Sequence, residues 1–143
     1  MPFEYIDEIA IADVAFKAWG QTLEEMFIAA ADATISVMVE DLETIERRQD
    51  REIEISSFAV DMLLFNLLQE IIFFKDAEQL LLRIEKVAVT SNDAQYVAKA
   101  TARGEPIDPG RHEMIVDVKA VTLHRFKVEQ TRRGWEAFVI LDV

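Results

Sequence analysis

The chain has 143 residues, with 27 acidic against 15 basic side chains, a formal net charge of −12 and no cysteine. The missing cysteine excludes disulfides, thiolate zinc sites and cysteine nucleophiles. The acidic excess disfavours strong direct nucleic-acid binding, because such binding gains affinity when Lys and Arg neutralise phosphates, and it is compatible with divalent cations or a basic protein partner.

The first elements predicted along the chain are two short strands and a helix. Residues 3–9 and 13–19 alternate apolar and polar side chains, as strands with one wet face do. Thr22 and Glu25 have the spacing of a capping box, in which each side chain accepts from a backbone amide of the first turn. Apolar residues then recur at steps of three and four as far as Met38, which predicts a helix with a single apolar stripe that lies on a sheet.

The most apolar stretch, residues 57–74, predicts a second helix at the centre of the fold. Its apolar residues nearly encircle the helix, so we expect neighbours on most sides, with Ser57 as the N-cap. Polar side chains such as Asp61 and Glu70 interrupt the stretch too early for a membrane span. Before this helix we predict a charged surface connection at residues 40–50 and a short strand at 51–55. After it we predict a turn at 75–79.

Four strands and a loop are predicted after the second helix. A hairpin turn at Ser91, Asn92 and Asp93 joins the first two of these strands, because Asn and Asp tolerate unusual backbone angles. The element order predicts a single α+β domain, residues 1–143, in which two helices pack on a mostly antiparallel sheet and a strand-helix-strand-strand unit occurs twice. The strands are predicted at 80–89, 95–103, 114–129 and 135–142, and the loop, GEPIDPGRHE, at 104–113.

Acidic groups near both ends of the chain are the candidate metal ligands. Asp13 opens a strand in the apolar setting IADVAF, while Asp142 and the terminal carboxylate of Val143 end the last strand. Carboxylate oxygens of this kind suit Ca²⁺ or Mg²⁺. The alternative is that Asp13 satisfies a local turn and Asp142 belongs to a frayed terminus. Spacing alone favours this alternative, since the sequence does not show whether the two ends meet.

Other residues that could carry chemistry have simpler interpretations. His112 and His124 lack the spacing of a zinc site, so we interpret His112 as a hydrogen-bonding loop residue and His124 as a packed strand residue. The sequence contains neither a G-x-S-x-G serine nor a glycine-rich phosphate loop. The last predicted hairpin is locally basic, which we interpret as a solvated sheet face rather than an RNA contact; its cations are Lys119, Arg125, Lys127, Arg132 and Arg133.

Three stretches taken together resemble the archease family, small accessory proteins of RtcB-type RNA ligases. They are ADVAFKAWGQTLEEMF at residues 12–27, GEPIDPGRHEMIVDVKAVTLH at 104–124, and LDV at 141–143. The helix around LLQEIIFFKD, residues 67–76, also looks like the corresponding family helix. The second stretch is the most specific, and the resemblance runs in order through nearly the whole chain.

The resemblance implies a strand-helix-strand-strand module with a second one inserted into it. It also implies a noncatalytic activator in tRNA splicing, which promotes guanylylation and multiple turnover of the ligase. Family metal ligands fall on Asp13, Asp142 and Val143 of this chain, with calcium as the expected ion and magnesium or manganese as alternatives. Where the family commonly has D-H-T-A-D, residues 9–13 read IAIAD, so the His and Thr of that motif are absent.

We therefore expect an RtcB-type RNA ligase as the partner of a cytoplasmic chain that does not bind membranes and is a monomer or weak homo-oligomer. The first alternative is a metal-dependent enzyme that acts on a small phosphorylated substrate with the same carboxylates. It would need a general base and grouped phosphate donors, which the sequence does not display. The second alternative is a chaperone-like module that binds proteins in general through an exposed sheet edge or helix stripe.

Overall fold

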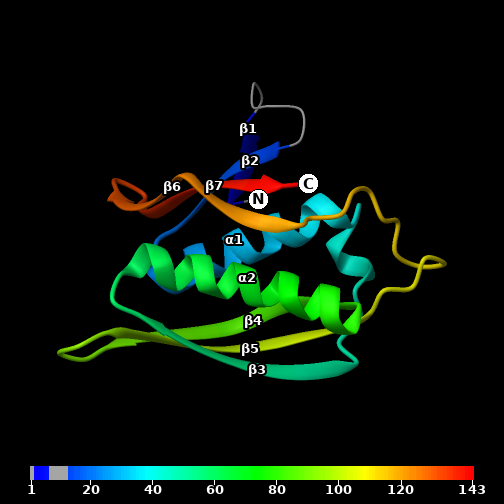
Figure 1. Ribbon diagram of the computed structural model, residues 1–143, viewed down its shortest axis with the longest axis horizontal. Helices are drawn as coiled ribbons and strands as arrows, with labels where there is room; N and C mark the ends of the chain where they lie inside the picture. Colours follow the sequence, from blue (N-terminus) through cyan, green and yellow to red (C-terminus); the bar gives the residue numbers. More distant parts are fainter. Residues whose placement is uncertain (1, 7–12) are drawn as a thin grey trace.

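The computed structural model describes residues 2–6 and 13–143. Two antiparallel sheets lie on opposite sides of a layer of two helices (Figure 1). The first sheet has the order β1 (Phe3–Ile6), β2 (Asp13–Gly20), β7 (Gly134–Asp142) and β6 (Ala120–Thr131), and the second has the order β3 (Gln49–Ser57), β5 (Tyr96–Pro106) and β4 (Leu80–Ser91). The helices are α1 (Leu23–Met38) and α2 (Val60–Glu78), and a short 3-10 turn, η1 (Leu42–Thr44), follows α1.

The chain builds one module inside another. It begins the first sheet with β1, β2 and α1, then forms the whole second sheet with β3, α2, β4 and β5, and returns to the first sheet with β6 and β7. All the strand pairs within these sheets are antiparallel. The predicted α+β fold with an inserted strand-helix-strand-strand module is therefore confirmed. The predicted strand at residues 3–9 is described only as far as Ile6, and residues 7–12 lie outside the described residues.

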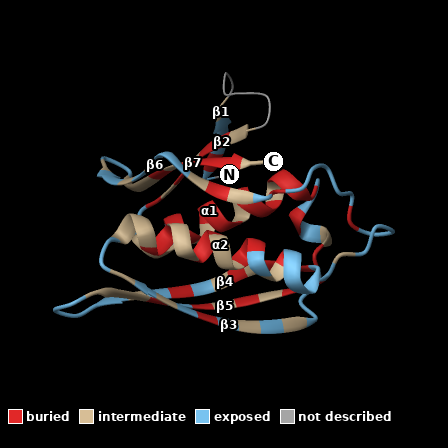
Figure 2. Ribbon diagram, in the orientation of Figure 1, coloured by how far each residue is buried: buried red, intermediate tan, exposed pale blue. Residues whose placement is uncertain are grey.

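The helix at the centre of the molecule is α1, not α2 as the sequence suggested. Both helices contact both sheets, but α1 is buried around most of its circumference instead of along one stripe, and Figure 2 shows it largely in the colour of buried residues. A run of small side chains permits this close approach from two sides; they are Ala29, Ala30, Ala31 and Ala33. In contrast, α2 leaves Phe73 56% exposed. No helix among the described residues has the length and apolar character needed to cross a membrane.

The predicted caps are right for α1 and wrong for α2. The Glu25 amide donates to Thr22 Oγ1 at 3.1 Å, while the Glu25 carboxylate accepts from the Gln21 amide, one residue before the cap, at 3.0 Å. Helix α2 begins after Ala59 and has no side-chain cap, because Ser57 is still part of β3. The helix also continues to Glu78, through the predicted turn at residues 75–79.

The predicted strand at residues 114–129 is shorter and is interrupted. Its first residues pair elsewhere: the Ile115 amide donates to the carbonyl of Met38 at the end of α1 at 2.8 Å, and β6 begins only at Ala120. Within β6, four residues at 123–126 face the single residue Val139 of β7, because Thr122 pairs with Ile140 and Lys127 with Phe138. Period-two alternation persists through both interruptions, so it could not reveal them. His124 lies in this bulge and is exposed, so its interpretation as a packed residue is wrong.

The hairpin of β4 and β5 has the predicted turn, and at Gly104 its two backbones approach each other closely. In the turn, Asn92 Oδ1 accepts from the amides of Ala94 and Gln95 at 2.9 and 3.0 Å. Farther along β5, a Cβ atom on Gly104 would overlap the carbonyl oxygen of Leu81. Only glycine therefore fits between β3 and β4 at this position.

We expect Gly104→Ala to destabilise the protein by about 2 kcal/mol, because the overlap is with backbone that cannot rotate away. Urea unfolding followed by circular dichroism measures the change. Gly110→Ala is the matched control, since the nearest atom to its Cβ would be a carboxylate oxygen of Asp108 at 3.2 Å, the end of a side chain that can move. Equal stability of the two variants would contradict this account of Gly104.

Candidate metal site at the strand ends

The structure brings the two predicted aspartates together. Asp13 is the first residue of β2 and Asp142 is the last of β7, and they occupy directly paired positions of the antiparallel ladder. Paired residues of this kind project from the same face, with Cβ atoms about 5 Å apart. The alternative in which Asp13 serves a local turn and Asp142 frays is therefore wrong: both belong to the sheet.

The end of β7 is fixed by its other neighbour. Asp142 also pairs with Ala120, the first residue of β6, and its carbonyl oxygen accepts from the Lys119 amide at 2.8 Å. Val143 follows directly, half-buried, with its side chain against the core. The ladder on both sides of β7 thus holds the strand end that carries the candidate ligands.

The chemistry of the pair fits a hard divalent cation. Two carboxylates at directly opposed positions repel each other unless a positive charge lies between them. Carboxylate oxygens are the donors that Ca²⁺ and Mg²⁺ prefer. Within residues 2–6 and 13–143, no three His, Asp or Glu side chains form a metal-binding group. The third predicted donor, the terminal carboxylate of Val143, belongs to the chain end and stays a prediction.

A buried ionic cluster, which the sequence analysis missed, organises the loop before β6. Glu105 at the end of β5 is 1% exposed and accepts from both terminal nitrogens of Arg111. It also contacts His112, whose Nε2 lies 2.9 Å from Glu105 Oε2. Because His112 Nδ1 accepts from the Asp108 amide at 2.8 Å, its proton is on Nε2, where it can donate to Glu105. His112 is thus the hydrogen-bonding loop residue that was predicted.

The electrostatics of this cluster favour the ionised form of Glu105. The Arg111 guanidinium lowers the pKa of Glu105 to about 2, helped by the Glu46 amide and His112 and opposed by burial. The charged and polar residues of the GEPIDPGRHE motif therefore bind one another. The motif has a structural role: it holds the loop before β6 in place. The available signal was a Glu six residues before an Arg in a loop rich in Pro and Gly, but that spacing has no general structural meaning.

A second buried charge holds residues 117–119, the segment that connects this loop to β6. Lys75 of α2 is 5% exposed, and its Nζ donates to Asp117 Oδ1 at 2.5 Å and to the carbonyl of Val118 at 2.8 Å. Burial lowers the pKa of Lys75, but hydrogen bonds to Asp117 and Asp76 outweigh it, so the net pKa is raised. Because Lys119 hydrogen-bonds to Asp142, this contact connects α2 to the candidate site.

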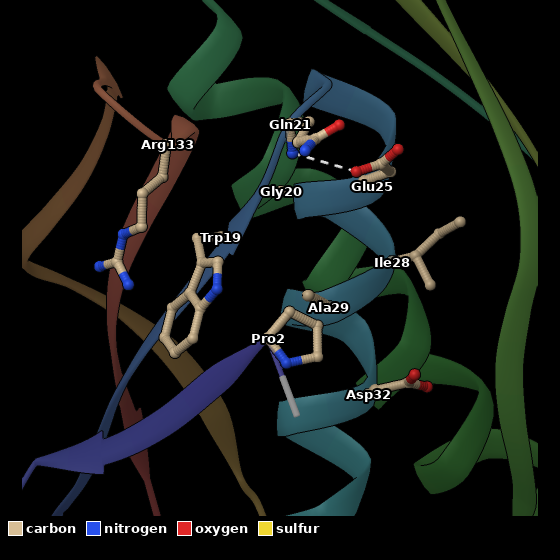
Figure 3. A pocket seen from close by; sticks show the side chains of 9 residues that line it. All are labelled: Pro2, Trp19, Gly20, Gln21, Glu25, Ile28, Ala29, Asp32 and Arg133. Atoms are coloured by element: carbon tan, nitrogen blue, oxygen red, sulfur yellow. Dashed lines mark hydrogen bonds between the residues drawn. The ribbon is translucent and has the colours of Figure 1, made fainter.

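A pocket of about 610 Å³ lies at the opposite end of β2. Figure 3 shows the Trp19 ring between Arg133 and Pro2, with the guanidinium carbon 4.5 Å from the ring centroid. The two carboxylates that line the pocket already have partners: Glu25 accepts from the Gln21 amide, and Asp32 is paired with Arg83 at 3.1 Å. The pocket is lined by Pro2, Trp19, Gly20, Gln21, Glu25, Ile28, Ala29, Asp32 and Arg133.

Comparisons with known proteins agree with this fold and its length. Residues 3–143 match the Archease protein family (MTH1598/TM1083). Protein archease of Methanothermobacter thermautotrophicus is 38% identical over 141 residues, covering 99% of this chain and 98% of that protein. Protein archease of Pyrococcus abyssi is 35% identical over 133 residues, covering 92% and 93%.

Solved structures give the same result. The solution structure of Methanobacterium thermoautotrophicum protein 1598 has a TM-score of 0.85, with 34% identity and 99% coverage of both chains. The crystal structure of an archease, possible chaperone, from Thermotoga maritima has a TM-score of 0.64 and 16% identity over 96% of this chain and 97% of that one, and shows the fold alone. The class is a small α+β protein with two helices between antiparallel sheets. The chain belongs to the archease family.

Proposed function

We propose that this chain is a noncatalytic activator of an RtcB-type RNA ligase in tRNA splicing, and that it promotes ligase guanylylation and multiple turnover in the cytoplasm. The observation that carries the proposal is the pairing of Asp13 with Asp142 in a chain of the archease family. It supports the ligand set that the family resemblance implies, although the His and Thr of the family motif are absent from residues 9–13.

Asp13, Asp142 and the terminal carboxylate of Val143 would hold the cation, with calcium as the first candidate and magnesium or manganese as alternatives. A cation held there would offset phosphate charge while the ligase histidine is guanylylated. The residues of this chain would bind the ion and present it to the partner. The net charge of −12 suits a partner with a basic surface around its nucleotide site, because opposite charges steer the two proteins together.

A reconstituted guanylylation assay tests the proposal. The RNA ligase of the same organism is incubated with GTP and with or without this chain, first in EDTA and then with calcium, magnesium or manganese. We expect the chain to bind the ligase in a pull-down and to raise both the guanylylated fraction and the number of turnovers in a metal-dependent manner. A ligase that turns over equally well without the chain, whatever the ion, would disprove the activator function.

A chaperone-like function is the second candidate, and one surface feature favours it. Large apolar side chains lie exposed outside the core, including Phe58 at 83% and Leu123 at 60%. The consecutive residues Met114, Ile115 and Val116 are also exposed, which is unusual unless a partner covers them. Suppression of the aggregation of an unrelated client protein, without any ligase, would favour this candidate. The Thermotoga maritima relative is described as a possible chaperone.

A further inference from the structure

One row of residues crosses the outer face of the first sheet. Lys17 of β2 and Lys127 of β6 both pair with Phe138 of β7. Val139 and Leu141 of β7 are buried in the core beside the helices, and side chains alternate between the faces of a strand. Phe138 therefore projects from the opposite, outer face, with a lysine on each side.

The bulge of β6 adds an arginine to this row. Arg125 has a φ of 56°, a left-handed conformation that costs free energy for a residue other than glycine. Bulges commonly redirect a side chain toward a functional surface. Here the guanidinium carbon of Arg125 lies 4.8 Å from the centroid of the Phe138 ring. The irregular backbone thus places a flat cation on an aromatic ring between two lysines.

These side chains line a pocket of about 470 Å³, which we call the Phe138 pocket. Its volume falls in the range of small-molecule sites. Its three cations outnumber its two carboxylates, in a chain whose net charge is −12. The pocket therefore concentrates positive charge and aromatic surface where the rest of the molecule is acidic. The lining residues are Lys17, Arg125, Phe126, Lys127, Glu129, Glu136 and Phe138.

We propose that the Phe138 pocket binds a nucleoside monophosphate unit. The base would stack on the guanidinium plane of Arg125, which itself lies over the ring of Phe138, as unpaired bases stack on aromatic and arginine side chains. Lys17 and Lys127 would contact the phosphate, since both ammonium groups come from positions beside Phe138. The unit can come from a free mononucleotide or from the end of an RNA strand, and both offer the same chemistry.

The two carboxylates in the pocket do not prevent phosphate binding. Lys17 lies 3.7 Å from Glu136, and Lys127 lies 3.1 Å from Glu129. The Lys127–Glu129 pair is exposed, and exposed ion pairs contribute little free energy, while the Lys17 side chain is 40% exposed beside the more buried Glu136. The ammonium groups can therefore turn from a carboxylate to a phosphate. The carboxylates and the acidic chain keep the site weak and local, in agreement with the expectation that the chain does not bind nucleic acid strongly.

Nuclear magnetic resonance of the isotope-labelled chain alone tests the inference. The probes, added at low salt, are guanosine 5′-monophosphate (GMP), guanosine, inorganic phosphate, and a short single-stranded RNA with a terminal phosphate. We expect GMP at millimolar concentration to shift the backbone amide signals of Lys17, Arg125, Lys127 and Phe138, and guanosine to bind more weakly than GMP. Because no ligase is present, failure here leaves the proposed activator function untouched, and failure of that function leaves this result untouched.

Single substitutions separate the two contacts. Phe138→Leu is expected to weaken GMP binding about tenfold through loss of stacking, with no change for inorganic phosphate. Lys127→Gln should weaken both, while Glu129→Gln, which removes the competing carboxylate, should strengthen both. Arg47→Gln is the matched control, because Arg47 is exposed on the loop before β3 and pairs with Glu85 instead. The same spectra report whether each variant is folded.

The outcomes are decisive. If the chain binds the RNA and GMP with equal affinity, the free nucleotide is the sufficient ligand. If it binds the RNA more tightly, the ligand is a strand end. Both results support the pocket. The inference is overturned if no signal near the pocket moves, if guanosine binds as well as GMP, or if Arg47→Gln weakens binding as much as Lys127→Gln does.

Discussion

Asp13→Asn and Asp142→Asn are each expected to abolish the response of the protein to calcium. The two carboxylates occupy paired positions on one face of the sheet, so each should contribute half of the side-chain donors to a bound ion. Asparagine keeps the size of the side chain and removes its charge. In EDTA the variants should be at least as stable as the parent, because a repulsion between like charges has been removed.

The size of the calcium effect follows from binding linkage. An ion that binds only the folded state stabilises it by about 2.7 kcal/mol when its concentration is one hundred times the dissociation constant. For a chain of 143 residues this corresponds to a rise in melting temperature on the order of 10 °C. Differential scanning calorimetry with calcium and with EDTA measures the rise in the parent, and its loss in either variant.

The same variants test the link to the ligase. We expect both to bind the ligase and to stimulate its turnover far less than the parent does. The matched control is Glu54→Gln, which removes an exposed carboxylate of β3 that pairs with Lys99 at 3.5 Å. Folded Asp13→Asn and Asp142→Asn proteins that stimulate the ligase as well as the parent would rule out a role for these carboxylates in activation.

The fold class could be predicted from the sequence because each element carries its own local pattern. Alternation marked β2 and β7, and the spacing of Thr22 and Glu25 marked the start of α1. Which helix is central could not be predicted, because burial depends on what covers a helix and not on its apolar content alone. The alanines of α1 have little apolar surface each, yet they allow two sheets to approach the same helix.

The candidate site could likewise be predicted only in part from the sequence. Asp13 and Asp142 could be selected as residues, but their pairing is a contact across almost the entire chain, and neither strand contains information about its partner. The Glu105 cluster and the buried Lys75 were missed because their partners lie in irregular segments, where no periodicity exists. The bulge that places Arg125 on Phe138 was missed for the same reason: it inserts three extra residues, and β6 alternates on both sides of it.

Glu105→Gln is expected to lower the free energy of unfolding by about 3 kcal/mol at neutral pH, because it leaves Arg111 and the buried His112 without their common charged acceptor. The loop between β5 and β6 should loosen first, since its contacts with Glu46 and with the end of α1 depend on this cluster. Hydrogen exchange of the amides of His112 and Ile115 should therefore accelerate more than exchange within the strands.

The pH dependence of the same variant gives a sharper test. The pKa of Glu105 is lowered in the folded state from its ordinary value of 4.5 to about 2, so the unfolded chain binds its proton more readily than the folded one. The stabilisation is therefore fully present above the ordinary pKa and is lost as the pH falls toward 2. The stability difference between parent and Glu105→Gln should shrink across this interval.

Urea unfolding at a series of pH values measures this difference. Glu43→Gln is the matched control: its carboxylate is 86% exposed and lies 3.5 Å from Arg83, so it should change stability little at any pH. A constant difference between the parent and Glu105→Gln from neutral to acid pH would mean that the substitution acts through packing alone. A difference that disappears in acid, together with an unchanged control, would show that the negative charge of Glu105 holds the loop against the molecule.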